Sequence, residues 1–148
     1  MIITDDSKSI EFVPVSYQFP ELTKDNKHYD EWDSNWLNIR FFCSDGQSIR
    51  HTETDACVLT YEMTDFIDGL KKLSRGLSDD ARLDTLEPYF KIDVVKSQSG
   101  YEVTVGFYRF IEAKKDLDLF EVKTVFGEEE LSLFISGLEE EFKPFPKR

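Results

Sequence analysis

The stretch YFKIDVVKSQSGYEVTVGFYRF, residues 89–110, decides the fold because it predicts a β-hairpin. Two runs rich in aromatic and β-branched residues flank the polar sequence KSQSG, which is typical of a turn. Apolar side chains recur at every second position of each run, so we expect one face of each strand to be buried. The residues expected on these faces are Phe90, Ile92, Val94, Tyr101, Val103, Val105 and Phe107. A third strand over residues 118–126 would extend the hairpin into an antiparallel meander.

The N-terminal part of the sequence shows the same period of two. Residues 9–19 predict a strand, and Pro14 within it indicates an edge position or a bulge because proline cannot donate to a strand ladder. Residues 35–42 predict a second strand, followed by a turn at Asp45-Gly46 and a return strand over residues 48–52. Alternation in the second strand puts Leu37, Ile39 and Phe41 on the core face and Trp36, Asn38, Arg40 and Phe42 on the other.

Two segments have the helical spacing of three and four residues and predict amphipathic helices at about 61–75 and 128–142. Thr60 or Thr64 could cap the first helix, and Gly76 stands where a glycine commonly ends one. The polar segment 77–87 is expected to be a connection. The apolar stripes comprise Met63, Phe66, Ile67, Leu70 and Leu73 in the first helix, and Leu131, Phe134, Ile135, Leu138 and Phe142 in the second.

The order of strands, helix, strands and helix predicts an α+β fold. We expect a mostly antiparallel twisted sheet, or sheets, with the two amphipathic helices packed on it. The length of 148 residues is that of one domain, so residues 1–148 are expected to form a single unit. Cys43 and Cys57 stand in apolar settings and are expected to be buried, reduced thiols.

The acidic charge limits the classes of partner. Thirty Asp and Glu against 18 Lys and Arg give a formal net charge of -12, which disfavours nucleic-acid binding and favours a basic protein partner. The charge could equally serve only to keep the protein soluble. No apolar run approaches the roughly 20 residues that span a bilayer. The first ten residues do not resemble a secretory signal, so we expect a cytoplasmic protein without a membrane partner.

Catalytic patterns are weak in this sequence. The histidines, His28 and His51, lack the spacing of zinc hydrolases, and the glycines form no phosphate-binding loop. We therefore expect no catalytic site, no metal site, no cofactor and no enzymatic activity. An alternative is a small hydrolase-type enzyme in which His28 or His51 acts with Glu87, whose position before Pro88 makes it the carboxylate to test for burial.

An acidic segment precedes the second predicted strand. Asp30, Glu31 and Asp33 surround Trp32, and a second tryptophan, Trp36, follows. Each tryptophan could pack in or beneath the core, or anchor a partner from the surface. Because carboxylates beside an exposed aromatic ring suit a basic partner, we predict that Asp30, Glu31, Trp32 and Asp33 form a partner-binding surface.

Four motifs together resemble the WapI family of immunity proteins. They are Tyr17-Gln18-Phe19-Pro20, Asp30 with residues 33–37 (DSNWL), residues 57–63 (CVLTYEM), and residues 86–90 (LEPYF). The resemblance implies a protein that protects a bacterium in contact-dependent competition by binding and neutralising the C-terminal domain of a polymorphic toxin. That domain is a tRNA nuclease in the namesake system, so the implied partner is a basic nuclease. A generic acidic protein-interaction module remains the alternative from the residues alone.

Overall fold

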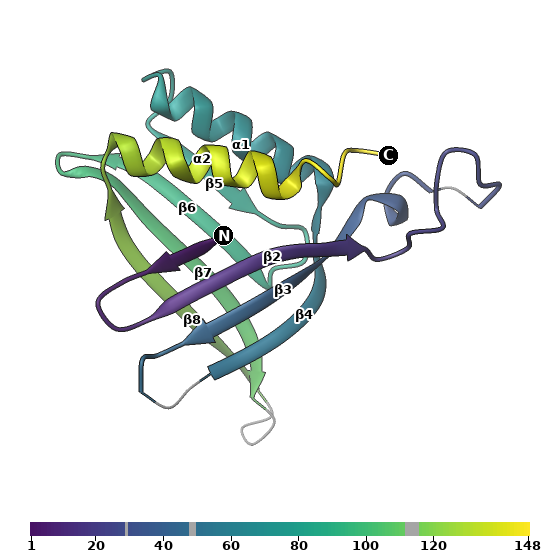
Figure 1. Ribbon diagram of the computed structural model, residues 1–148, viewed down its shortest axis with the longest axis horizontal. Coiled ribbons are helices and arrows are strands. Elements are labelled where there is room, and N and C mark those ends of the chain that lie inside the picture. Colours follow the sequence, from purple (N-terminus) through teal and green to yellow (C-terminus); the bar gives the residue numbers. More distant parts are fainter. Residues whose placement is uncertain (29, 48–49, 112–115) are drawn as a thin grey trace.

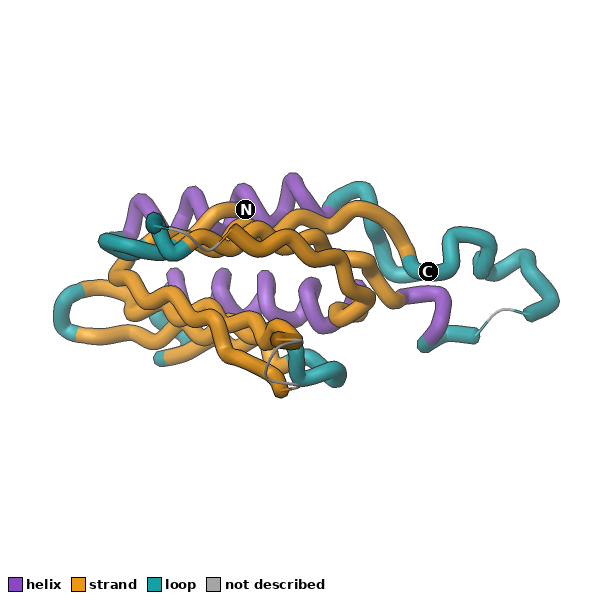
Figure 2. Tube along the Cα trace, turned by 90° about the horizontal axis from the view of Figure 1, so that it is seen from below, coloured by secondary structure: helices purple, strands orange, loops and turns teal. Residues whose placement is uncertain are grey.

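A computed structural model describes residues 1–28, 30–47, 50–111 and 116–148, but not the side chains of residues 50–53, 109–111 and 116–117. Two four-stranded antiparallel sheets carry the fold, and the strands of one run across those of the other (Figure 1). The first sheet contains β1 (Ile2–Thr4), β2 (Ser9–Tyr17), β3 (Trp36–Ser44) and β4 (Arg50–Leu59) in that order. The second contains β5 (Asp80–Asp84), β6 (Phe90–Ser97), β7 (Gly100–Ile111) and β8 (Asp116–Phe126). The two sheets form separate layers (Figure 2).

The two helices are α1 (Thr60–Ser74) and α2 (Glu128–Phe142), each following the last strand of a sheet. They lie side by side along one edge of the molecule (Figure 1), where the Lys71 ammonium group lies 2.8 Å from the Glu139 carboxylate. The predicted α+β class is therefore confirmed, and both helix ranges agree with the apolar spacing to within one residue. The predicted helix stripes are buried at Met63, Phe66, Ile67, Leu70, Leu73, Leu131, Phe134, Ile135, Leu138 and Phe142.

The hairpin predicted from residues 89–110 is formed by β6 and β7. Phe90 pairs with Phe107, Ile92 with Val105 and Val94 with Val103, and all six side chains are buried. The next strand, β8, joins β7 with Val122 opposite Val105. The buried face predicted by the period of two is thus one wall of the core.

The alternation predicted for β3 is also confirmed. Leu37, Ile39 and Phe41 are fully buried, whereas Phe42 is exposed on the opposite face. Pro14 pairs with Ile39, and the register of β2 against β3 shifts immediately after it, as expected of a bulge. Because β1 pairs only with Ser9 to Glu11 of β2, its ladder ends before this proline and needs no N–H from it.

Aromatic rings join the two sheets. The Phe41 ring of β3 stacks on Phe107 of β7 with centroids 4.2 Å apart, and its centroid lies 5.0 Å from that of Phe90 in β6. Phe12 of β2 also contacts Phe90, at 5.0 Å. The predicted buried cysteines, Cys43 and Cys57, belong to the same core.

Two strands were not predicted from the sequence. The segment 77–87, expected to be a connection, contains β5, which pairs with β6 at the edge of the second sheet. Its inward residues are Ala81 and Leu83, and α1 packs on it closely enough that a Cβ added at Gly69 would lie 3.5 Å from the Ala81 Cβ. Ile2 to Thr4 form the short strand β1, which pairs with β2.

The ends of α1 differ in how well they were predicted. Neither Thr60 nor Thr64 caps its start; the Glu62 carboxylate instead accepts hydrogen bonds from the N–H groups of Leu59 and Leu86, both at 2.8 Å. The C-terminal prediction is confirmed, since Gly76 has a φ of 70° and the Leu77 N–H returns to the Lys72 carbonyl at 2.9 Å. This is the hydrogen bond of a Schellman cap.

The Glu62 carboxylate gives a pH-dependent contribution to stability. Burial raises its pKa above the ordinary value of 4.5, although its two backbone hydrogen bonds oppose the shift. The folded protein therefore binds this proton more tightly than the unfolded chain does. Its contribution is complete below pH 4.5 and is lost as the pH rises through the raised pKa. We expect the unfolding free energy of the wild type minus that of Glu62→Gln to fall as the pH rises above 4.5.

Urea denaturation at several pH values measures this difference. The exposed Glu102→Gln on β7 provides the matched control for removing one carboxylate. A difference that rose with pH would contradict the role given to Glu62.

Candidate partner-binding site

The predicted acidic segment is a turn held by one of its own carboxylates. Asp30 accepts hydrogen bonds at Oδ1 from the backbone N–H of Trp32 at 2.8 Å and of Asp33 at 3.1 Å. The Asp30 carbonyl oxygen also accepts from the Ser34 N–H at 3.0 Å. The 3-10 helix Asp33–Asn35 follows directly and leads into β3. Asp30 therefore positions the turn, and all four side chains of residues 30–33 are exposed to a partner.

A buried asparagine ties this turn to two other parts of the chain. The Asn35 side chain is fully buried, and its Nδ2 donates to the Glu31 carbonyl at 2.6 Å. Its Oδ1 accepts from the Thr60 hydroxyl at 2.7 Å and from the Arg148 N–H at 2.9 Å. Because a buried amide is costly to leave without hydrogen bonds, these contacts fix the acidic turn against the start of α1 and the tail after α2.

Trp32 is an exposed ring on a rigid support. Its side chain is 56% exposed, and its edge meets the ring of Tyr61, the second residue of α1, with centroids 5.9 Å apart. The two rings line a surface hollow of about 510 Å³, called the Trp32 hollow below. Its lining residues are Glu31, Trp32, Tyr61, Thr64, Asp65 and Lys147.

The tail after α2 places a lysine in the Trp32 hollow. Lys147 Nζ lies 2.8 Å from Glu31 Oε1 and 5.5 Å from the centroid of the Tyr61 ring. Lys147 lowers the pKa of Glu31, chiefly through their hydrogen bond. Desolvation and the charge of Glu62 raise the pKa of Tyr61, while the charge of Lys147 opposes this shift. The hollow therefore combines a carboxylate, two aromatic rings and a cation from the same chain.

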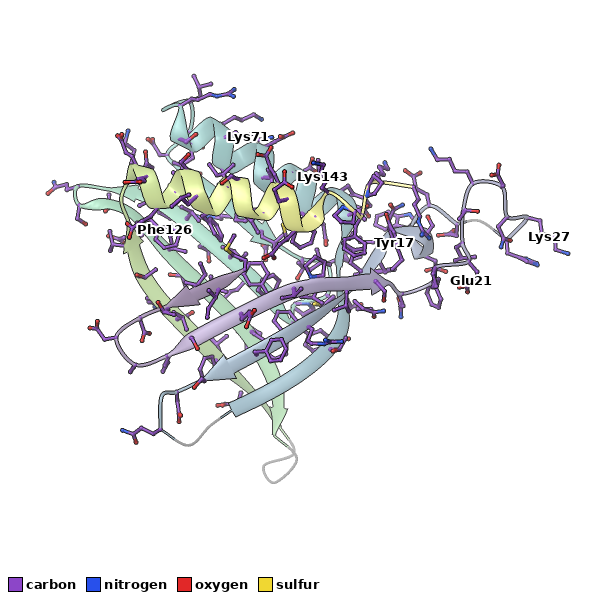
Figure 3. All side chains as sticks on the ribbon, viewed as in Figure 1. Tyr17, Glu21, Lys27, Lys71, Phe126 and Lys143 are labelled. Carbon is purple, nitrogen blue, oxygen red and sulfur yellow. The ribbon has the colours of Figure 1, made fainter. Side chains whose placement is uncertain are left out.

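Contacts on both sides of Lys147 hold the tail. The Tyr17 hydroxyl donates to the Pro146 carbonyl at 2.6 Å, and Figure 3 shows Tyr17 at the end of β2, beside the tail. The Arg148 guanidinium stacks 3.4 Å from the centroid of the Tyr17 ring and donates to the Phe19 carbonyl at 3.3 Å. The backbone at Lys147 is thus fixed independently of its side chain.

A second hollow adjoins the first. It lies between α1 and α2, has a volume of about 490 Å³, and shares Thr64 with the Trp32 hollow. Met63, Ile67 and Phe142 contribute apolar lining, and Lys71 joins the two helices through Asp68 and Glu139. The hydrogen bond from Glu139 raises the pKa of Lys71. The rim of this groove thus carries ion pairs, and the one between Lys71 and Glu139 connects the two helices.

Of the four predicted site residues, Glu31 and Trp32 line the hollow, and Asp30 and Asp33 flank them in the same turn. The structure adds four lining residues that the sequence did not indicate for this site. Tyr61, Thr64 and Asp65 of α1 and Lys147 of the tail are placed beside Trp32 only by the tertiary fold. Tyr61 and Asp65 could have been read as residues of the polar helix face opposite Met63. Nothing in the sequence pattern connects Lys147 to residues 30–33. The second tryptophan, Trp36, is half-buried on the outer face of β3.

The residues proposed for the enzyme alternative do not form an enclosed site. His28 is exposed in the loop after β2, and Glu87 is exposed between β5 and β6. The side chain of His51 lies outside the described residues. Among the side chains that the structure describes, no group of three or more His, Cys, Asp and Glu could hold a metal ion. No helix in the described ranges is long and apolar enough to cross a membrane.

Comparison with known proteins identifies the family. The model of the immunity protein WapI-like family matches residues 1–146. The chain belongs to this family. It is 25% identical over 138 residues to the immunity protein WapI of Bacillus subtilis (strain 168), and the alignment covers 92% of this chain and 88% of that protein. The crystal structure of WHY1 from Arabidopsis thaliana aligns with a TM-score of 0.48 and 11% identity, covering 98% of this chain and 88% of that one.

Membership of the WapI-like immunity family confirms the resemblance seen in the four sequence motifs. It supports a toxin-neutralising role for this chain, with a toxin protein as the partner. It also suggests an inhibitor that performs no reaction of its own.

Proposed function

We propose that this chain neutralises the C-terminal nuclease domain of a polymorphic toxin in bacterial contact-dependent competition, by binding it in the cytoplasm through the acidic turn and the Trp32 hollow. The observation that carries the proposal is the exposed Trp32, which lines a hollow together with Glu31 and Asp65 and stands on a turn held by hydrogen bonds. A domain that binds nucleic acid is expected to be basic, and the net charge of -12 would attract it and speed association.

Glu31, Trp32 and Asp33 are the direct contacts in this proposal, together with Asp65 of α1. Asp30 contributes by holding Trp32 and Asp33 in place through its two backbone hydrogen bonds. Charge complementarity at such a surface speeds the encounter of the two proteins and fixes their relative orientation. A desolvated aromatic residue contributes most to the affinity. The surface is preformed, so binding needs little ordering of the loop.

The first test is binding and protection measured together. The C-terminal domain of the toxin encoded immediately upstream of this chain is expressed with and without it, and the purified pair is titrated by calorimetry. We expect rescued growth and a dissociation constant of about nanomolar or below. Absence of both binding and rescue would overturn the proposed function.

A charge-reversal variant tests the surface itself. We expect Glu31→Lys with Asp33→Lys and Asp65→Lys to weaken the complex by about a hundredfold or more, because three carboxylates facing a basic partner become repulsive. The matched control, Asp6→Lys with Asp79→Lys and Glu102→Lys, makes the same change of net charge at exposed positions outside the turn and hollow. The control should slow association moderately through the weaker overall field. Equal losses in both variants would mean that total charge, not this surface, governs binding.

A further inference from the structure

We propose that the Trp32 hollow binds one arginine side chain of the toxin domain, which takes the place of Lys147 in the ion pair with Glu31. This inference rests on the proposed function and goes beyond it by naming the group that is recognised.

The carboxylate and ring that line the hollow already contact a cation of this chain, which indicates the chemistry they accept. Lys147 is paired with Glu31 at 2.8 Å and lies over the Tyr61 ring. Asp65 lines the same hollow and adds a second carboxylate. A carboxylate next to the faces of aromatic rings is suited to a guanidinium or ammonium group, because ring quadrupole and carboxylate attract the same charge.

The ion pair between Lys147 and Glu31 is exposed. The Lys147 side chain is 54% exposed and that of Glu31 is 60% exposed, and ion pairs at such positions contribute little to stability. The Tyr17 and Arg148 contacts hold the tail backbone without the Lys147 side chain. In the proposal, the Lys147 side chain leaves Glu31 while the tail backbone stays in place.

The Tyr61 hydroxyl favours arginine as the displacing group. Its oxygen is buried and is the one buried side-chain N or O atom in the described part of the chain that has no hydrogen-bond partner. A guanidinium group carries five N–H donors in a planar fork, so after pairing with Glu31 it has N–H groups left for a second acceptor. The proposal makes the Tyr61 oxygen this acceptor once the Lys147 side chain has moved away. An ammonium group has no such planar fork with which to span both acceptors.

The test uses a small probe and then the toxin domain. Nα-acetyl-arginine amide is titrated into the protein while the indole N–H signals of the two tryptophans are followed by NMR; Trp32→Phe assigns the Trp32 signal. The neutral isostere Nα-acetyl-citrulline amide is the ligand control. We expect arginine, but not citrulline, to shift the Trp32 signal.

Removing the resident cation should strengthen binding. We expect Lys147→Ala to bind both the arginine probe and the toxin domain about twofold to tenfold more tightly than the wild type, because an exposed ion pair and cation–π contact no longer compete. Lys96→Ala, at an exposed position on the β6–β7 hairpin, is the control and should change neither affinity. Tyr61→Phe should reduce the preference for arginine over the corresponding lysine probe.

The outcomes separate this inference from the proposed function. Tight toxin binding without a Trp32 shift on adding arginine, and without a gain in Lys147→Ala, would overturn the arginine site and leave the immunity function standing. Arginine binding in the hollow without toxin binding or protection would overturn the proposed function, and with it the toxin as the source of the arginine. Equal gains in Lys147→Ala and Lys96→Ala would overturn displacement and indicate an effect of overall charge.

Discussion

The Phe41→Ala variant is expected to lose about 3–5 kcal/mol of unfolding free energy. Phe41 is fully buried and contacts Phe107 and Phe90 of the opposite sheet, with ring centroids at 4.2 and 5.0 Å. Alanine removes the ring that joins the two layers, and strands fixed by their ladders can close only part of the cavity. Since domains are stable by only about 5–15 kcal/mol, the loss should be visible as a large fall in the urea midpoint.

The adjacent residue provides the control. Phe42 carries the same side chain on the opposite face of β3, where it is 38% exposed, and Phe42→Ala is expected to cost about 1 kcal/mol or less. A variant that conserves much of the volume, Phe41→Leu, should recover most of the loss. Similar losses for Phe41→Ala and Phe42→Ala would contradict the placement of Phe41 between the sheets.

The contrast between Phe41 and Phe42 also shows what could be predicted from the sequence. A period of two in apolar residues states which neighbour is buried, because successive side chains of a strand point to opposite faces. The same argument predicted β6 and β7, and the helical spacing predicted α1 and α2. These patterns are local, and they predict the structure correctly because each of these elements buries one continuous face.

The elements missed by the sequence reading lack such a face. In β5 only Ala81 and Leu83 point inward, while Asp80, Arg82 and Asp84 are exposed. Charged side chains are common on edge strands, where they discourage pairing with other chains. The start of α1 was misread for another reason: Glu62 performs the capping through its side chain, and it also binds Leu86, which only the fold brings near.

The candidate site also contains residues that could be predicted from the sequence and residues that could not. The acidic turn was predictable because carboxylates and tryptophan are adjacent in sequence. Tyr61 and Lys147 were not, since their approach to Trp32 depends on how α1 and the tail pack around Asn35. Asp30, which was predicted as a contact, also holds the turn, and this second role follows from its hydrogen bonds and not from its residue type.

Trp32→Ala is expected to weaken the toxin complex by about 2–4 kcal/mol, or about thirtyfold to a thousandfold in Kd. The ring is 56% exposed, and the turn that carries it is fixed by Asp30 and Asn35. A rigid, exposed aromatic side chain can bury a large apolar area on binding at little cost in conformational entropy. Calorimetric titration measures the change, and Trp32→Phe should retain part of the affinity.

The same substitution distinguishes a contact residue from a structural one. If Trp32 serves a partner, Trp32→Ala should raise Kd while changing the unfolding free energy by about 1 kcal/mol or less, since much of the ring faces solvent in the free protein. Leu133→Ala on α2, at a side chain that is 64% exposed, is the control and should alter neither quantity. If Trp32 instead serves to cover Tyr61, Trp32→Ala would lower the unfolding free energy and leave Kd unchanged. That result would remove Trp32 from the interface, and with it the main reason for placing the toxin on this face.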